Sequence, residues 1–165
     1  MLRRPALVVA ALLLSMRLGA QGPTVTAART TLEGCTYDAC ALRLDRSFFG
    51  GRKVVVGLDG QRLPMGAIGG GLVTQVARVP GAADEARAGR GNALKAAIGG
   101  VIGTIASVVA LNQFDRGNSG SSNDGVAFGA LGVGVVASIT AGVQAQYAER
   151  HFSRAVWLYN RELPR

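Results

Sequence analysis

Two long apolar stretches constrain this chain more than any other feature. They cover residues 94–111 and 126–143, each 18 residues long, and Lys95 is the only charged residue in either. A helix of that length is roughly 27 Å long, just short of the ~30 Å apolar thickness of a bilayer. A polar loop over residues 112–125 separates the two stretches. This pattern predicts a transmembrane helical hairpin; the alternatives are a soluble or oligomeric helical hairpin and buried β-strands.

Small residues recur at intervals of four within both stretches. Residues four apart share one face of a helix, so each helix would carry a groove of small side chains. In lipid such grooves let two helices approach closely, whereas in water each glycine costs about 1 kcal/mol relative to alanine. We therefore predict helix packing, and self-association into a homo-oligomer, through these positions: Gly99, Gly103, Ser107, Ala130, Gly134, Ser138 and Gly142.

Residues 1–20 have the composition of a signal peptide. Arg3 and Arg4 supply a positive start, residues 6–16 are apolar, and small residues precede Gln21. These are the three parts that an export signal requires. We predict export to the cell envelope with cleavage before Gln21; an uncleaved anchor is the alternative.

The net charge of +8 does not indicate a nucleic-acid-binding surface, because no compact basic cluster alternates with aromatic residues. We therefore exclude nucleic acid as a partner. An enzyme is not expected either, since the chain holds a single histidine, no nucleophile beside a base and no recognisable pair of carboxylates. No catalytic residue, cofactor or metal site is predicted.

The two cysteines, Cys35 and Cys40, predict a disulfide that closes a small loop. An even number of cysteines at short spacing favours a disulfide in an oxidising compartment. Free thiols are the alternative. A metal site would need further ligands, and His151 lies far away in the sequence. A redox motif has two residues between its cysteines, whereas this pair encloses four.

Residues 21–65 predict a small antiparallel β module. After an irregular lead-in, apolar and charged residues alternate from Leu42, and residues 52–58 contain three consecutive valines. Pro64 restricts a third strand, over residues 61–65, to the edge of the sheet. Three short strands bury little apolar surface, so this meander needs a packing partner.

Residues 66–93 predict a linker rich in glycine and alanine. The glycine-rich run at 66–71 is interpreted as a flexible joint or a close backbone approach, because no Lys-Ser/Thr follows it to make a phosphate loop. Residues 72–79 predict a short helix that Pro80-Gly81 stops. Residues 82–92 are either linker or a helix that leads into the hairpin.

Residues 144–165 predict an amphipathic, basic tail helix. Two partners for its apolar stripe remain open. Aromatic and arginine residues beyond an apolar segment suit a membrane interface with anionic headgroups. Alternatively, the stripe packs on the β module and supplies its missing partner. The stripe consists of Tyr147, Phe152, Ala155, Val156 and Tyr159.

The tail also contains polar residues with predicted roles. We expect His151 and Asn160 to form hydrogen bonds where the tail makes its contact, rather than to act in catalysis. The predicted membrane-interface residues are Tyr147, Arg150, Arg154, Trp157 and Arg161.

The charge distribution conflicts with an exported N-terminus. Export places residues 21–93 and the tail outside and the loop at 112–125 inside. The loop carries Asp115, Arg116 and Asp124 and is net negative, whereas the flanking segments are net positive. The positive-inside rule prefers the opposite orientation.

Three features together resemble a group of small uncharacterised bacterial envelope proteins. They are Phe48-Phe49-Gly50-Gly51 after a Cys-Ala-Leu-Arg-Leu strand, the glycine-zipper hairpin, and the ending that runs from Arg154 to Arg161 and contains Ala-Val-x-x-Tyr-Asn. In the family, as here, that motif reads Ala-Val/Ile-x-x-Tyr-Asn. The resemblance implies no activity and no functional residues.

The sequence therefore predicts an α+β chain with a disulfide-tied β meander, a glycine-rich helical hairpin and an amphipathic tail helix. The expected role is structural or adaptor-like in the cell-envelope membrane. The expected partners are the lipid bilayer, further copies of the chain and an unidentified envelope protein. A pore-forming or membrane-perturbing oligomer is the alternative function.

Overall fold

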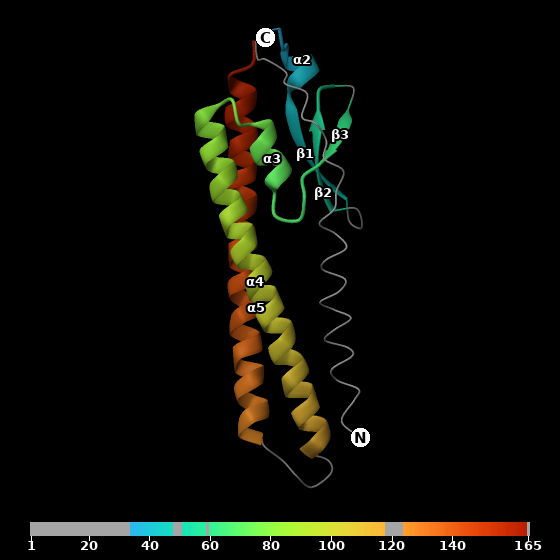
Figure 1. Ribbon diagram of the computed structural model, residues 1–165, viewed down its shortest axis with the longest axis vertical. Coiled ribbons are helices and arrows are strands. Elements are labelled where there is room, and N and C mark those ends of the chain that lie inside the picture. The colour runs from blue at the N-terminus through green and yellow to red at the C-terminus, as the bar shows by residue number, and fades with distance from the viewer. Residues whose placement is uncertain (1–33, 48–50, 59, 118–123, 165) are drawn as a thin grey trace.

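The computed structural model describes residues 34–47, 51–58, 60–117 and 124–164. The predicted signal peptide, the lead-in of the β module and the centre of the polar loop lie outside these ranges. Two long helices run side by side in opposite directions, and a small sheet packs against one end of the pair (Figure 1). We call residues 34–79 the head and the two long helices the stem.

The head contains the predicted antiparallel meander. Helix α2 (Tyr37–Cys40) precedes the strands β1 (Leu42–Ser47), β2 (Gly51–Val56) and β3 (Gln61–Pro64). The sheet order is β1-β2-β3, with Leu42 opposite Val56 and Val56 opposite Gln61. Pro64 lies in β3 at an edge of the sheet, as predicted, where its missing N–H costs no ladder hydrogen bond.

The disulfide between Cys35 and Cys40 is confirmed, and it closes a loop over α2. The end of β2 lies directly against this loop. Gly57 has a φ of +67°, and a Cβ at this position would lie 2.6 Å from the carbonyl oxygen of Ala39. Only glycine fits both the backbone conformation and the space.

Helix α3 (Gly70–Gln75) begins two residues before the predicted short helix and ends four residues earlier. It is followed by α4 (Pro80–Gly117), which is 38 residues long. Pro80 starts α4 rather than only stopping α3, because proline is favoured in the first turn of a helix. Residues 82–92 are therefore helix and not linker, and the first apolar stretch continues them without a break.

Helix α5 (Asp124–Arg161) is also 38 residues long. The prediction of a separate tail helix is wrong, because residues 126–143 and the tail form one continuous helix. The physical reason is the absence of a breaker, since residues 143–161 contain neither glycine nor proline. The tail direction is thus set by the apolar stretch before it.

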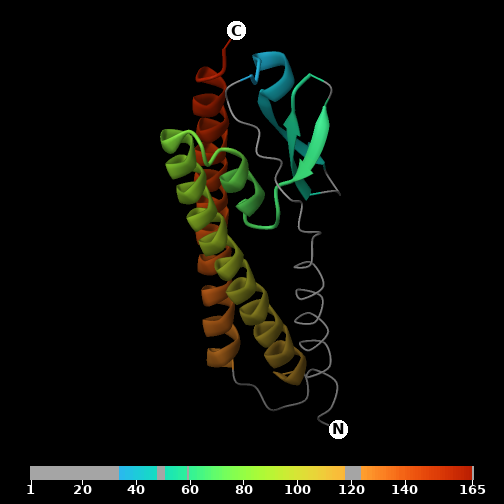
Figure 2. The same ribbon diagram turned by 45° about the horizontal axis from the view of Figure 1, so that its top comes forward.

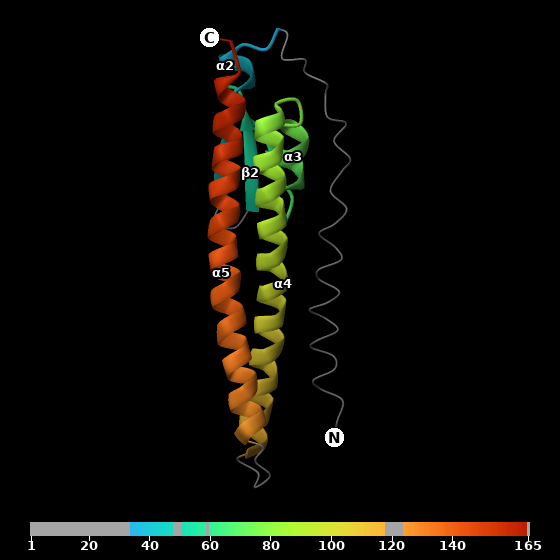
Figure 3. The same ribbon diagram turned by 90° about the vertical axis from the view of Figure 1, so that its left-hand side faces the viewer.

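The hydrophobic core lies between the head and the adjoining end of the stem. Figures 2 and 3 show the sheet and α3 beside this end of the stem only, while the other end of the helix pair extends beyond them. The largest fully buried side chains come from both parts: Leu42, Val54, Met65, Leu72, Val76 and Phe152.

Candidate functional site: the apolar band and its junction with the head

The part of the stem that extends beyond the head exposes large apolar side chains. We call residues 96–114 of α4 and 125–143 of α5 the apolar band. Soluble monomers rarely expose a continuous apolar surface of this extent. The following band residues are each between 38% and 68% exposed: Ile98, Ile102, Ile105, Val109, Leu111, Phe114, Val126, Phe128, Leu131, Val133, Val135, Val136, Ile139 and Val143.

Charged residues limit the band at both ends. No charge lies between Lys95 and Asp115 on α4, or between Asp124 and Glu149 on α5. The 96–114 segment spans roughly 28 Å as a helix, which is close to the ~30 Å thickness of a bilayer core. Both long helices are therefore long and apolar enough to cross a membrane, with a mean hydropathy of 1.9 for α4 and 2.0 for α5 in their most apolar windows.

Small residues bring the two helices into close contact within the band. A Cβ added to Gly99 would lie 3.2 Å from both the carbonyl oxygen of Ala137 and the Cβ of Ala141. A Cβ added to Gly103 would lie 2.8 Å from the Oγ of Ser138 and 3.4 Å from the carbonyl oxygen of Gly134. At both positions the helices approach so closely that an alanine would require neighbouring atoms on α5 to shift.

Ser107 of α4 also lies at this contact, opposite Gly134 of α5. Its Oγ would be 3.3 Å from a Cβ added to Gly134, and its hydroxyl donates a hydrogen bond to the carbonyl oxygen of Gly103 at 2.8 Å. The Ser107 hydroxyl therefore has its hydrogen-bond acceptor within α4. It does not need an acceptor on α5.

Gly142 does not lie at the helix contact, and its predicted packing role is wrong within this chain. A Cβ at Gly142 would meet no atom within 4 Å. Steps of four residues turn about 40° around a helix, so the three steps from Ala130 to Gly142 turn about 120°. Steps of seven turn only about 20°. The contact face of α5 accordingly follows the seven-residue series Ala127, Gly134, Ala141, Ala148 and Ala155, and Ala130 is half-buried beside it.

Phe152 joins the head to the stem. Its side chain is fully buried, and it lies between a glycine of α4 and a glycine in the turn before α3. A Cβ on Gly89 of α4 would lie 2.7 Å from the ring, and a Cβ on Gly69, which has a φ of +77°, would overlap it. The sequence placed Phe152 on the apolar stripe, but it did not reveal which glycines receive the ring.

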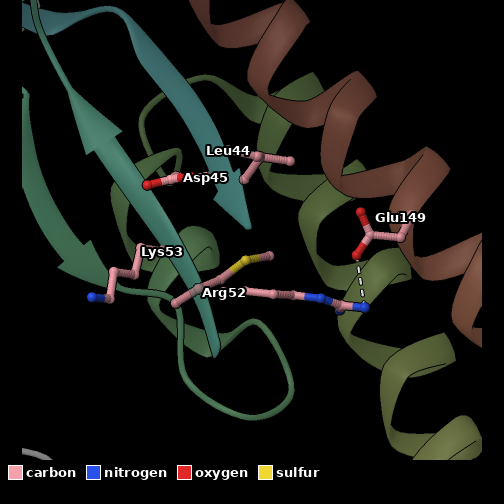
Figure 4. Close-up of a pocket in the computed structure, with 6 residues that line it drawn as sticks. Leu44, Asp45, Arg52, Lys53 and Glu149 are labelled. Carbon is pink, nitrogen blue, oxygen red and sulfur yellow. Dashed lines mark ion pairs between the residues drawn. The ribbon is translucent and has the colours of Figure 1, made fainter. Parts of the chain in front are cut away.

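Arg52 reinforces the same junction from β2. Its guanidinium lies 6.0 Å from the centre of the Phe152 ring, and its Nη2 pairs with Oε1 of Glu149 at 2.7 Å. Figure 4 shows Arg52 reaching from the sheet toward α5, while Lys53 points away from the helices. The hollow beside this ion pair measures about 10 Å³, which is room for one water molecule rather than a substrate.

Asn160 holds the edge of β1, as the predicted hydrogen-bonding role required. Its Oδ1 accepts a hydrogen bond from the Leu42 N–H at 2.8 Å, and its Nδ2 donates to the Leu42 carbonyl oxygen at 2.9 Å. The amide thereby replaces a neighbouring strand at this edge. The neighbouring Tyr159 is buried, which raises the pKa of its hydroxyl despite the opposing charge of Arg78, so it packs as a neutral ring.

His151 also forms the predicted hydrogen bond. Its Nδ1 lies 2.7 Å from Oε2 of Glu85 on α4, and Nε of Arg154 lies 3.1 Å from the other oxygen of the same carboxylate. Together with the burial of Phe152 and Tyr159, these contacts decide between the two interpretations of the tail. Apart from Tyr147, which is 46% exposed, the apolar stripe packs on the β module and on α4.

The five predicted membrane-interface residues fall into two groups according to their distance from the apolar band along α5. Tyr147 and Arg150 lie within two turns of the band, and the Arg150 guanidinium is 5.7 Å from the centre of the Tyr147 ring. Arg154, Trp157 and Arg161 lie roughly 16–27 Å beyond the band along α5, beside the head. For those three, the interface role stays a prediction. Arg161 covers the exposed Trp157 ring at 5.1 Å.

Within the described ranges, no three His, Cys, Asp or Glu side chains lie close enough together to hold a metal ion. The chain matches no family model, no curated protein and no solved structure.

Proposed function

We propose that this protein is a membrane-anchored protein of the bacterial envelope, in which the apolar band crosses the bilayer and the head lies at one membrane surface. The exposed apolar band carries this proposal. It is the length of a bilayer core, it is free of charge, and it exposes large aliphatic side chains on both helices.

The energetic balance favours lipid around the band. Complete burial of a large apolar side chain is worth about 1.5–3 kcal/mol. If lipid removes the exposed half of each of the fourteen side chains from water, the total is roughly 10–20 kcal/mol, which is at least comparable to the stability of a typical domain. A protein that kept this surface in water would forgo that gain.

The proposed role is non-enzymatic and structural or adaptor-like. Three contacts support it by joining the head firmly to the membrane anchor: Phe152 between its glycines, the Arg52–Glu149 ion pair and the Asn160 hydrogen bonds. An anchor joined in this way would hold the head at a defined height above the bilayer. An unidentified envelope protein would be its partner.

Two features favour a location of the head on the outer side of the membrane. The signal-like residues 1–20 favour export, and a disulfide in the head favours an oxidising compartment. The resemblance to small envelope proteins agrees with both and remains part of the proposal.

The proposed anchor is one chain with two spans. The grooves predicted for self-association are occupied by the chain's own helices, since Gly99, Gly103 and Gly134 face the opposite helix. A second copy cannot use the same faces while this contact exists. Oligomer formation would need another surface.

The pore-forming alternative gains no support from the band. Thr104, Ser107 and Thr140 each donate a hydrogen bond to the carbonyl oxygen four residues earlier in the same helix. A water-filled pore needs a polar lining, whereas residues 96–111 and 125–143 contain only four polar side chains, namely Thr104, Ser107, Ser138 and Thr140.

Alkaline carbonate extraction of cell membranes tests the anchor. The full chain should stay in the membrane pellet, and sequencing of its N-terminus should begin at Gln21. The double variant Ile102→Arg and Val136→Arg should shift the chain to the supernatant, because a charge at the centre of a span costs about 2.5–3.5 kcal/mol. Leu58→Arg, at an exposed head position, is the matched control. Release of the unmodified chain into the supernatant would refute the membrane anchor.

A further inference from the structure

The two ends of the apolar band differ in charge. At the end away from the head lie Asp115 and Asp124, with Arg116 as the single base. At the head end lie three exposed bases, namely Arg90 and Lys95 on α4 and Arg150 on α5. Only the head end therefore has unbalanced positive charge beside the predicted membrane surface.

The acidic residues near these bases are paired with other groups. Asp84 pairs with Arg87 at 2.7 Å, Glu85 with both His151 and Arg154, and Glu149 with Arg52. In the part of the chain that the structure describes, no ion pair includes Arg90, Lys95 or Arg150. Their charges are thus available to an external anion.

The positions of these three bases along the stem, measured from the end of the apolar band, match the thickness of the headgroup layer. Lys95 is the residue directly before the band on α4, and Arg90 lies roughly 7 Å further toward the head. Arg150 has a similar height, because Gly89 of α4 lies against Ala148 and Phe152 of α5. The headgroup layer on each side of a bilayer is roughly 5–8 Å thick, and long basic side chains extend into it. The half-exposed Tyr147 ring lies between the band and Arg150.

We propose that Arg90, Lys95 and Arg150 form a basic collar that binds anionic phospholipid headgroups in the leaflet on the head side. This inference rests on the proposed membrane anchor. The collar includes bases from both helices of the stem. It selects for lipid charge and not for a particular headgroup structure, because its members are separate bases and not a shaped pocket.

The test is lipid selectivity of the purified full chain in vesicles. Electron spin resonance with spin-labelled phosphatidylglycerol and phosphatidylcholine gives their relative association with the protein. Each base near an anionic surface is worth about 1 kcal/mol, or about fivefold. We expect phosphatidylglycerol to be preferred several-fold, and the preference to weaken in 1 M NaCl because the charges are screened.

The variant Arg90→Gln, Lys95→Gln and Arg150→Gln should bring the ratio close to one. The matched control carries Arg43→Gln, Arg62→Gln and Arg161→Gln, which removes the same charge from exposed positions away from the band and should keep the preference. If the chain is embedded in both kinds of vesicle but shows no preference for phosphatidylglycerol, the collar proposal is wrong. The same holds if the collar variant keeps the preference. Neither result would contradict the membrane anchor. If the chain enters neither vesicle, both proposals fail.

Discussion

Asn160 acts at the residue scale as a substitute for a neighbouring strand. β1 is an edge of the sheet, and the Leu42 peptide groups beside α5 would otherwise face a buried surface without partners. One side-chain amide satisfies both, because it carries a donor and an acceptor. This explains in physical terms why asparagine follows tyrosine near the end of α5.

Asn160→Ala should therefore destabilise the head. An unsatisfied buried backbone group costs about 1–3 kcal/mol, and this change leaves two such groups. The free energy of unfolding, measured by guanidinium titration with circular dichroism in detergent micelles, should fall by about 2 kcal/mol or more. Asn112→Ala is the control, since the Asn112 amide donates only to Val108 on its own exposed helix surface. Equal stability of the two variants would contradict the role of Asn160.

Phe152→Ala should produce a larger loss. Removal of a buried phenylalanine ring typically costs 3–5 kcal/mol, and here the cavity would open between Gly69 and Gly89. The same titration should show this loss, with the head becoming sensitive to protease. Phe128→Ala serves for comparison, because Phe128 is 63% exposed in the band. A small effect of Phe152→Ala would mean that the head does not depend on this contact.

At the scale of elements, the pairing of α4 with α5 depends on small residues along one face of each helix. The glycines on that face differ from those that point outward. Gly103 lies against α5, whereas a Cβ on Gly100, three residues earlier, would meet no atom within 4 Å. Glycine content alone cannot distinguish these two positions.

Gly103→Leu should force the helices apart, whereas Gly100→Leu should not. Inserting bulk into a packed contact costs about 1–3 kcal/mol, and the Ser138 side chain and Gly134 backbone leave no room here. Thermal unfolding followed by circular dichroism should show a lower midpoint only for Gly103→Leu. Gly142→Leu should behave like Gly100→Leu. A lowered midpoint for all three would show that these outward positions also pack, against lipid or a second copy.

At the scale of the whole molecule, the antiparallel stem places the head and the C-terminal end of α5 together at one end (Figure 1). A band that crosses the bilayer would then leave the other ends of both helices on the opposite side. The positive-inside rule would direct the basic end, and with it the head, to the cytoplasm, whereas export and the disulfide favour the outside.

Cysteine labelling should resolve this orientation. With an impermeant maleimide on intact cells, Ser153→Cys should be labelled and Asp124→Cys protected, because the two exposed positions lie beyond opposite ends of the band. The unmodified chain is the control, since its two cysteines form a disulfide. Labelling of Asp124→Cys alone would place the head in the cytoplasm. Equal labelling of both would contradict the two-span arrangement.

The sequence by itself determined the local structure of this protein. Alternation after residue 41 and Pro64 predicted the meander and its edge strand, the spacing of Cys35 and Cys40 predicted the disulfide, and the apolar stretches predicted two long helices. These features depend on residues close together in the chain, so their periodicity and spacing are visible in the sequence.

Only the tertiary structure decided which surfaces meet. It showed that α5 continues into the tail, that Phe152 lies between Gly69 and Gly89, and that Asn160 pairs with Leu42, which is 118 positions away. It also placed Gly103 inside the helix contact and Gly142 outside it. These outcomes depend on the register between distant segments, which is set by the fit of side chains across the contact and has no period within either segment.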